Sequence, residues 1–367
     1  MVGIRQWCAR IFENNSPCNR PSDLYQTAAR YSIPRSYQHR LVYVVRYELL
    51  LFQRLHTTTM RLSAAHLESV LLLLVISSFA PYRAHAQNES CGTVADSAMV
   101  LFNSEHPLVH IDASMRGGTV YLPITAHIVR TTTGTGGLSV SNLNTAIDDA
   151  NSVYIDAGIQ FILCGPIEYI NNSTWYNMNL SVTSESVLAA HDVDNVINAY
   201  FFNNLNDIDG SSLCGKSHFP GDGIDRFLMD NSCTTINNVF AHEIGHYFNL
   251  LHTHETAFGI EYVNGSNCTS AGDLLCDTPA DPNIDNQVNT SCVWTGSEDD
   301  PLGDPYDPST RNIMSYSDNN CRDEFTSMQY DRIYDAYSTF RPYLTCNVLT
   351  NDACADAIEL FSGAACS

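Results

Sequence analysis

The residues with the clearest chemical potential are two histidines four positions apart, His242 and His246, with Glu243 between them. On a helix this spacing places both imidazoles on one face, about 6 Å apart along the axis. Two imidazoles so placed can share one Zn²⁺ at about 2.0–2.1 Å. Glu243 directly follows the first histidine, so its carboxylate can reach a metal-bound water without binding the metal. The pattern therefore predicts a catalytic zinc site with Glu243 as the general base.

A third histidine, His252, would complete the set of zinc ligands. On an uninterrupted helix it would lie about 600° beyond His246, on the wrong face. It can return to the metal only if the backbone turns sharply, which usually requires a residue in the left-handed conformation. Asn249 stands at that place, and asparagine tolerates this conformation best after glycine. Spacing and turn residue together predict His252 as the third ligand.

The elements that must position these residues follow from the apolar pattern. Alternating or β-rich runs predict strands over 118–131, 159–170, 196–205 and 225–230. Helical spacing predicts helices over 141–157, with Ser141 as its N-cap and Gly158 at its end, over 234–249, which holds the zinc motif, and over 325–340. The stretch 253–312 is rich in turn-forming residues and predicts long loops held by disulfides rather than by a core.

The N-terminal region has a pattern typical of a secretion signal. Residues 69–80 form a long apolar run that is too short to span a bilayer, which needs about 20 residues. Met60-Arg61 precede this run, and the small-x-small site Ala84-His85-Ala86 follows it. We therefore expect residues 60–86 to be a signal peptide and residues 1–59 to be a mis-called extension. The alternative is a long cytoplasmic tail with an uncleaved signal anchor.

Composition narrows the classes of partner. The chain has 367 residues, with 18 basic and 40 acidic side chains and a net charge of −22. This balance excludes nucleic acid and anionic membranes as partners, because both need a positive protein surface. An apolar fraction of 44% is enough for a packed core. Thirteen cysteines indicate an oxidising compartment. We predict a secreted protein with no stable membrane association after signal cleavage.

Three segments together resemble one known family. The segment 242–252 resembles the extended zinc motif of the metzincin peptidases, and Asn312-Ile313-Met314-Ser315-Tyr316 resembles their methionine turn. With Cys276-Asp277-Thr278-Pro279, the pattern is similar to the pappalysin-like (cytophagalysin and ulilysin-type) branch. The resemblance covers roughly residues 118–343 and implies a zinc endopeptidase.

The resemblance implies an α/β fold with a metzincin-type catalytic domain over 116–345. A twisted, mostly parallel sheet and the active-site helix would form an upper half, above an irregular lower half stapled by disulfides. Residues 346–367 would be the start of a truncated module or a tail. Met314 would form an apolar floor beneath the metal, and Tyr316 would stabilise the oxyanion, the alternative being a buried core tyrosine.

The resemblance also shows where this chain departs from the family. Asn249 stands where the family usually has glycine. Asn320 stands where members that select arginine carry an acid, which puts a preference for basic substrate side chains in doubt.

The cysteines carry a structural and a regulatory expectation. The resemblance implies the pairs Cys268–Cys292 and Cys276–Cys321, and Cys214–Cys233 is plausible across the strand that precedes the motif helix. For Cys91 two interpretations stay open. It is either an ordinary disulfide cysteine or a latency switch whose thiolate occupies the open zinc position. In the second case the protein is a zymogen, residues 87–115 are a pro-segment, and cleavage falls near 115–116.

A calcium site is a further expectation. Hard oxygen ligands gather in a loop with little apolar support, and the resemblance implies calcium near it. The candidate ligands are Asp273, Asp277, Thr278 and Asp281.

Two functions from different classes remain on this sequence. The first is a secreted zinc endopeptidase that hydrolyses polypeptide substrates. The alternative is a non-catalytic secreted binding module stabilised by zinc and calcium. Glu243 favours the first, because a purely structural zinc site needs no base and usually closes its fourth position.

Overall fold

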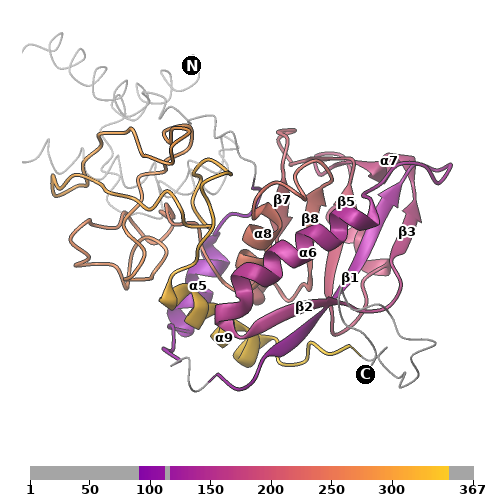
Figure 1. Cartoon of the computed structure of the whole chain (residues 1–367), viewed down its shortest axis with the longest axis horizontal. Coiled ribbons are helices and arrows are strands. Elements are labelled where there is room, and N and C mark those ends of the chain that lie inside the picture. The colour runs from indigo at the N-terminus through magenta and orange to yellow at the C-terminus, as the bar shows by residue number, and fades with distance from the viewer. Residues whose placement is uncertain (1–90, 112–115, 347–367) are drawn as a thin grey trace, which may run out of the picture. The chain divides into compact units, whose positions relative to one another are not determined.

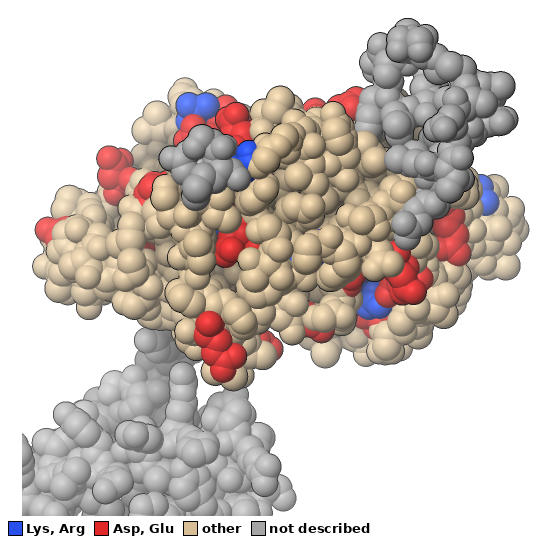
Figure 2. Space-filling view, turned by 90° about the horizontal axis from the view of Figure 1, so that it is seen from below, with Lys and Arg blue, Asp and Glu red and all other residues tan. Residues whose placement is uncertain are grey.

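The computed structural model describes residues 91–111 and 116–346. The expected extension (1–59), the signal peptide (60–86) and the C-terminal tail lie outside the described residues, as do 87–90 and 112–115 of the expected pro-segment. No helix in the described part is long and apolar enough to cross a membrane. In the space-filling view of one face, acidic side chains are scattered over the surface and basic ones are few (Figure 2).

A mostly parallel sheet forms the centre of the fold, with the strand order β2-β1-β5-β8-β7 and β3 paired to β1 (Figure 1). Its strands are β1 Val120–Arg130, β2 Ile159–Leu163, β3 Glu168–Asn171, β5 Ile197–Phe202, β7 Gly215–Ser217 and β8 Arg226–Asp230. Every pairing is parallel except that of β7 with β8. The edge strand β7 lies next to the site described below. The structure therefore has the α/β architecture with a mostly parallel sheet that was predicted.

Both faces of the sheet are covered, which explains the long apolar runs in its strands. On β1, Leu122, Ile124 and Ile128 pack in the larger core, whereas Val129 packs in a second core on the other face. The helices α6 Val140–Tyr154 and α8 Val239–Tyr247 contribute to the larger core and contact each other. This arrangement holds α8, the helix of the zinc motif, firmly against the sheet.

Several predicted boundaries are wrong for local reasons. The predicted strand 159–170 splits into β2 and β3, because Gly165 has a φ of 75° and Pro166 follows it. The predicted strand 196–205 ends at Phe202, and β6 Asn204–Asn206 pairs instead with β4 Asn177–Asn179 in a separate sheet. The N-cap of α6 is Ser139, whose side chain accepts a hydrogen bond from the Asn142 amide, and not Ser141.

The helices near the site also differ from the prediction. The motif helix begins at Val239 rather than at 234, because Asn238 at its N-cap is left-handed, with a φ of 57°. The closing helix α9 spans Ser327–Phe340, and Thr326 with Gln329 forms its capping box. The helix α5, Ser97–Glu105, was not predicted, although Asp96 caps its first turn. The remaining short helices are α7 Ser173–Tyr176, η2 Ile155–Ala157, η3 Glu185–Ala190 and η4 Pro220–Asp222.

Four disulfides link the described residues, and two of the expected pairs are wrong. Cys214–Cys233 forms as expected, and Cys164–Cys346 adds a pair that the sequence left unassigned. Cys268 pairs with Cys276 rather than Cys292, because a compact run of turns brings their Cα atoms to 5.0 Å.

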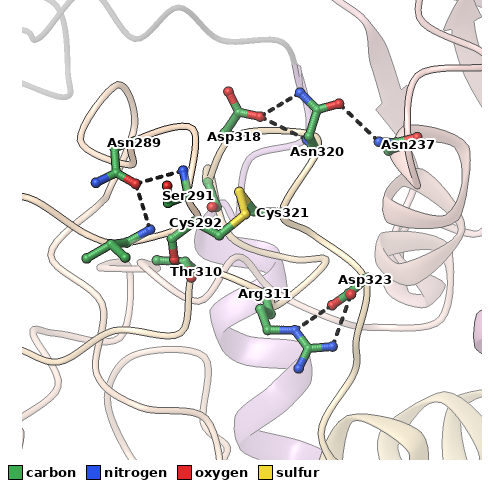
Figure 3. The surroundings of a disulfide bond; sticks show 12 residues. Asn237, Asn289, Ser291, Cys292, Thr310, Arg311, Asp318, Asn320, Cys321 and Asp323 are labelled. Atoms are coloured by element: carbon green, nitrogen blue, oxygen red, sulfur yellow. Dashed lines mark hydrogen bonds and ion pairs between the residues drawn. A yellow bond between two sulfur atoms is a disulfide. The ribbon is translucent and has the colours of Figure 1, made fainter.

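Cys321 was expected to pair with Cys276 but pairs with Cys292 (Figure 3). The Cα atoms of Cys292 and Cys321 are 5.5 Å apart. A hydrogen bond of 2.8 Å from Thr310 Oγ1 to the Cys292 carbonyl ties this loop to the segment before the methionine turn. The long loop is thus fastened beside the turn, but by a different cysteine from the one expected. Cys91 is the one free cysteine of the described residues.

Candidate metal centre

The first two histidines of the motif meet on the buried side of α8. His242 and His246 are 2% and 0% exposed, and their Nε2 atoms are 3.1 Å apart. The Nδ1 atom of His242 lies 2.7 Å from the Ile313 carbonyl, and that of His246 lies 2.8 Å from the Leu250 carbonyl. Each carbonyl accepts a hydrogen bond from Nδ1–H, which leaves the lone pair on Nε2. Two lone pairs therefore point at a common position.

His252 joins them because the chain reverses after the helix. Asn249 has a φ of 69°, the left-handed conformation that the spacing predicted. The Leu250 amide donates to the Gly245 carbonyl at 2.9 Å, which closes the turn. The Nε2 atom of His252 then lies 3.1 Å from that of His246. The structure thus brings the three predicted histidines together.

The donor set fits a metal ion. One ligand atom each from Cys91, His242, His246 and His252 lies within 4.8 Å of the others, and in the described part of the chain no other group of this kind occurs. Burial lowers the pKa of His246 to about 4 and the pKa of His242 and His252 well below the usual value. Neutral imidazoles whose lone pairs face one another within hydrogen-bond range need a cation between them. Nitrogen and sulfur donors of this kind suit zinc.

Glu243 is buried beside this cluster. Its side chain is 0% exposed, Oε2 accepts a hydrogen bond of 3.3 Å from Thr93 Oγ1, and Oε1 has no partner among the described residues. Burial raises the pKa of Glu243 to about 8, although hydrogen bonds from Cys91 and Thr93 oppose the shift. A Cβ at Gly215 would lie 2.5 Å from the Glu243 side chain, so the edge strand can pass here only as glycine.

Met314 and Tyr316 flank the histidines from the methionine turn. Met314 is fully buried beneath α8, and its sulfur would lie 2.6 Å from a Cβ at Gly245. The ring of Tyr316 lies 4.8 Å from the ring of His252, and its hydroxyl donates a hydrogen bond of 3.4 Å to the Cys91 carbonyl. A tyrosine hydroxyl therefore lies at the cluster, on the side that Cys91 occupies.

The segment that carries Cys91 runs along the edge of the sheet. Its sulfur lies 3.4 Å from Nε2 of His246, and the Gly92 amide donates to the Gly215 carbonyl on β7 at 2.8 Å. Thr93 accepts a hydrogen bond of 2.8 Å from the Ser217 amide. Burial and the charge of Glu243 raise the pKa of the Cys91 thiol. Sequence reasoning missed Thr93 and Gly215, because neither belongs to a motif and only the fold brings them to Glu243.

The four calcium candidates were expected to gather at one point, but in the structure their side chains have different hydrogen-bond partners. Asp273 accepts hydrogen bonds from Thr278 Oγ1 and the Leu275 amide, and Asp281 accepts them from Thr253 Oγ1 and the Asn283 amide. Asp277 instead accepts hydrogen bonds from the first turn of α9, where Thr326 Oγ1 and the Met328 amide donate at 2.8 Å. This arrangement favours a capping role for Asp277.

A residue outside the predicted set lies beside Asp273. Glu261 is 6% exposed, and its Oε2 atom, like Oδ2 of Asp273, is buried without a partner among the described residues. Burial, with a contribution from Asp273, raises the pKa of Glu261 to about 8, and burial raises the pKa of Asp273 to about 7. Two buried carboxyls with free oxygens are better placed for a cation than the other candidates. No motif marked Glu261 in the sequence.

Comparison with known proteins agrees with this geometry. Residues 182–338 match the family model of peptidase M43, pregnancy-associated plasma protein-A. An extracellular metalloprotease of Pyricularia oryzae is 26% identical over 276 residues, which are 71% of this chain and 90% of that protein. One of Colletotrichum graminicola is 25% identical over 293 residues, 73% of this chain and 97% of that protein.

Solved structures from Tannerella forsythia also match much of the chain. Mature mirolysin in complex with a cleaved peptide has a TM-score of 0.45 at 18% identity, covering 62% of this chain and 96% of that one. A promirolysin mutant has a TM-score of 0.46 at 16% identity, covering 70% and 97%. The family match over residues 182–338 and the relatives support a pappalysin-like metzincin, and the chain is a metalloendopeptidase.

Proposed function

We propose that the protein is a secreted zinc-dependent endopeptidase in which Glu243 is the general base. The observation that carries this proposal is the position of Glu243, a fully buried carboxyl with one unpartnered oxygen beside three convergent imidazoles. The relatives are named extracellular metalloproteases, and four disulfides suit an extracellular protein. His242, His246 and His252 are the proposed zinc ligands.

The roles of the other residues follow from their places. Zinc would supply an activated water and polarise the scissile carbonyl. Glu243 accepts the proton of the attacking water and passes it to the leaving amine, a transfer for which a pKa raised by burial is suitable. Tyr316 donates a hydrogen bond from its hydroxyl to the developing oxyanion. Met314 holds the floor of the site and binds nothing.

We also propose that Cys91 keeps the unprocessed protein latent. Its sulfur belongs to the convergent donor group and its segment lies along β7, so it would occupy the position that an attacking water needs. Tyr316 contacts the same segment through the Cys91 carbonyl. Cleavage near 115–116 would free the site by removing this segment.

Calcium remains a proposal for the loop that contains Asp273. The unpartnered oxygens of Asp273 and Glu261 support it, because a hard cation would satisfy both carboxylates. A calcium titration followed by the melting temperature tests it. Calcium should raise the Tm of the wild-type chain but not that of Glu261→Gln, and an equal rise in both would contradict the assignment.

Substitution of Glu243 tests the catalytic proposal. In the processed chain, from which the proposed pro-segment has been removed, Glu243→Ala should keep stoichiometric zinc and lose casein cleavage by at least about 100-fold. Glu255→Gln is the control, because Glu255 accepts hydrogen bonds from its own neighbours Thr256 and Ala257. Retained cleavage by Glu243→Ala would refute the general base. A processed wild-type chain that binds zinc but cleaves nothing would favour the non-catalytic binding module.

A further inference from the structure

A buried arginine lies directly behind the methionine turn. Arg322 follows the disulfide cysteine Cys321 and is only 4% exposed. One guanidinium nitrogen, Nη1, donates to the Ser315 carbonyl at 3.1 Å and approaches the Ile313 carbonyl at 3.5 Å. Nη2 donates to the side chain of Asn319. A single guanidinium therefore holds the two carbonyls that flank Met314.

Within residues 91–111 and 116–346, no carboxylate forms an ion pair with Arg322. Among the ion pairs of the described residues none involves Arg322, and its Nε atom is buried without a hydrogen-bond acceptor. An unpaired buried charge is costly unless its surroundings compensate it. Burial lowers the pKa of Arg322, and the nearby groups that oppose this shift are led by Cys91, Tyr316 and Glu243. Asp318 opposes the shift as well, so groups at the metal centre and in the methionine turn together favour this cation.

A single backbone carbonyl connects Arg322 to a proposed zinc ligand. The Ile313 carbonyl that Arg322 approaches also accepts a hydrogen bond of 2.7 Å from Nδ1 of His242. On the other side, the Arg322 carbonyl accepts a hydrogen bond of 2.8 Å from Asn238 Nδ2 at the N-cap of α8. Arg322 therefore links the methionine turn to the start of the helix that carries His242 and His246. Partners that orient a metal-binding histidine in this way tune its affinity for the metal.

We propose that Arg322 is a positioning residue of the metal centre. Its guanidinium fixes the carbonyls of the turn, and the Ile313 carbonyl in turn fixes the ring and tautomer of His242. This inference rests on the proposed zinc site, but it concerns the affinity and geometry of the site and not the identity of the general base. Tyr316 follows Ser315 directly, so the same clamp also sets the place from which its hydroxyl acts.

Metal affinity provides a test that does not depend on turnover. The measurement is competition for zinc with a chelator, on the full chain carrying Cys91→Ala and Glu243→Ala. Cys91→Ala removes the fourth donor, and Glu243→Ala prevents self-digestion. Adding Arg322→Gln should weaken zinc binding by roughly 10- to 100-fold. Arg311→Gln is the matched control. Arg311 lies in the same loop region but is exposed, and it pairs with Asp323 at 2.8 Å (Figure 3). This control should leave zinc affinity within twofold.

Kinetics of the processed enzyme with Glu243 intact give the second readout. Arg322→Gln should lower kcat by a similar factor and change KM by less than twofold, because the substrate contacts remain. Arg322→Lys keeps the charge but can donate to fewer carbonyls. Its zinc affinity and its kcat should therefore lie between those of Arg322→Gln and those of the parent. If Arg322→Gln does not fold, zinc affinity of Arg322→Lys decides the matter.

The outcomes separate this inference from the proposed function. A folded Arg322 variant with zinc affinity and kcat within twofold of the parent would overturn the positioning role. A wild-type enzyme without peptidase activity would refute the catalytic proposal and still allow the affinity test. Weaker zinc binding in Arg322→Gln but not in Arg311→Gln supports the positioning role in either case.

Discussion

The sulfur of Cys91 lies 3.4 Å from Nε2 of His246, although 155 positions separate the two residues. The contact is buried, and the neighbouring Gly92 is hydrogen-bonded to the edge strand β7. A thiol in this place can take the position in a zinc site that catalysis requires to be open. The segment that begins at Cys91 therefore packs directly against the three-histidine cluster and the edge strand.

Cys91→Ala should activate the unprocessed protein. Without the sulfur, nothing from the pro-segment would bind the metal, and peptide cleavage should rise by at least about 10-fold, since each 1.4 kcal/mol of lost competition is worth that factor. The measurement is cleavage of a quenched peptide by intact chain, with processing blocked and checked by mass. A variant no more active than the unprocessed wild type would end the latency interpretation in favour of an ordinary structural cysteine.

Asn249→Gly should loosen the docking of α5 without changing the metal centre. Asn249 Nδ2 donates to Asn103 Oδ1 of α5 at 3.2 Å, and the Asn103 amide is itself oriented by its bond to the Met99 carbonyl. Glycine adopts the left-handed conformation freely, so the turn to His252 survives. Losing one buried hydrogen bond should weaken docking of α5 by about 0.5–1.5 kcal/mol.

Hydrogen exchange of the α5 amides measures this effect directly. Faster exchange at α5, with unchanged zinc content, is the expected result for Asn249→Gly. Unchanged exchange at α5 would show that the Asn103–Asn249 contact contributes nothing to docking.

Tyr316→Phe should slow catalysis in the processed enzyme. Removing one oxyanion donor costs roughly 100- to 1,000-fold in kcat in comparable sites, whereas zinc binding does not need this hydroxyl. Steady-state kinetics and zinc content on the same preparation check both expectations. If kcat is unchanged and only the Tm falls, Tyr316 is a core tyrosine, which is the alternative that the sequence left open.

The stability contributed by His218 should fall as the pH rises. Burial alone lowers the pKa of His218, but hydrogen bonds to Asp222 and Glu185 outweigh it and raise the pKa above the usual 6.5. The folded protein therefore holds the proton more tightly than the unfolded chain. The resulting stability is fully present below pH 6.5 and is lost as the pH rises through the folded pKa.

Urea denaturation of His218→Gln at two pH values checks this expectation. The other charged side chains facing this group are Arg226, which pairs with Glu185 at 3.2 Å, and Arg341, which donates to the His218 carbonyl. At pH 6 the substitution should cost about 1.5–3 kcal/mol, the range for hydrogen bonds to charged groups. At pH 9 the cost should be smaller, and equal costs at both values would contradict the assignment.

Local features of the sequence were sufficient to predict the three-histidine cluster at the centre of the site. The four-residue spacing of His242 and His246 follows from helix geometry, and a residue tolerant of the left-handed conformation at Asn249 is enough to bring back His252. The strands and helices around them were predictable because the spacing of apolar residues in a buried segment follows the period of its secondary structure. Boundaries failed where a single residue, such as Gly165 or Asn238, ended an element early.

Contacts between distant segments could not be predicted in this way. The partner of Cys292, the approach of Thr93 to Glu243 and the clamp of Arg322 on the methionine turn all join residues far apart in the chain. Helical spacing and turn propensity act over a few residues, so the sequence alone determined which side chains form the three-histidine cluster. Only the packing of the loops and of the segment around Cys91 decided what surrounds that cluster, because those contacts depend on the whole path of the backbone.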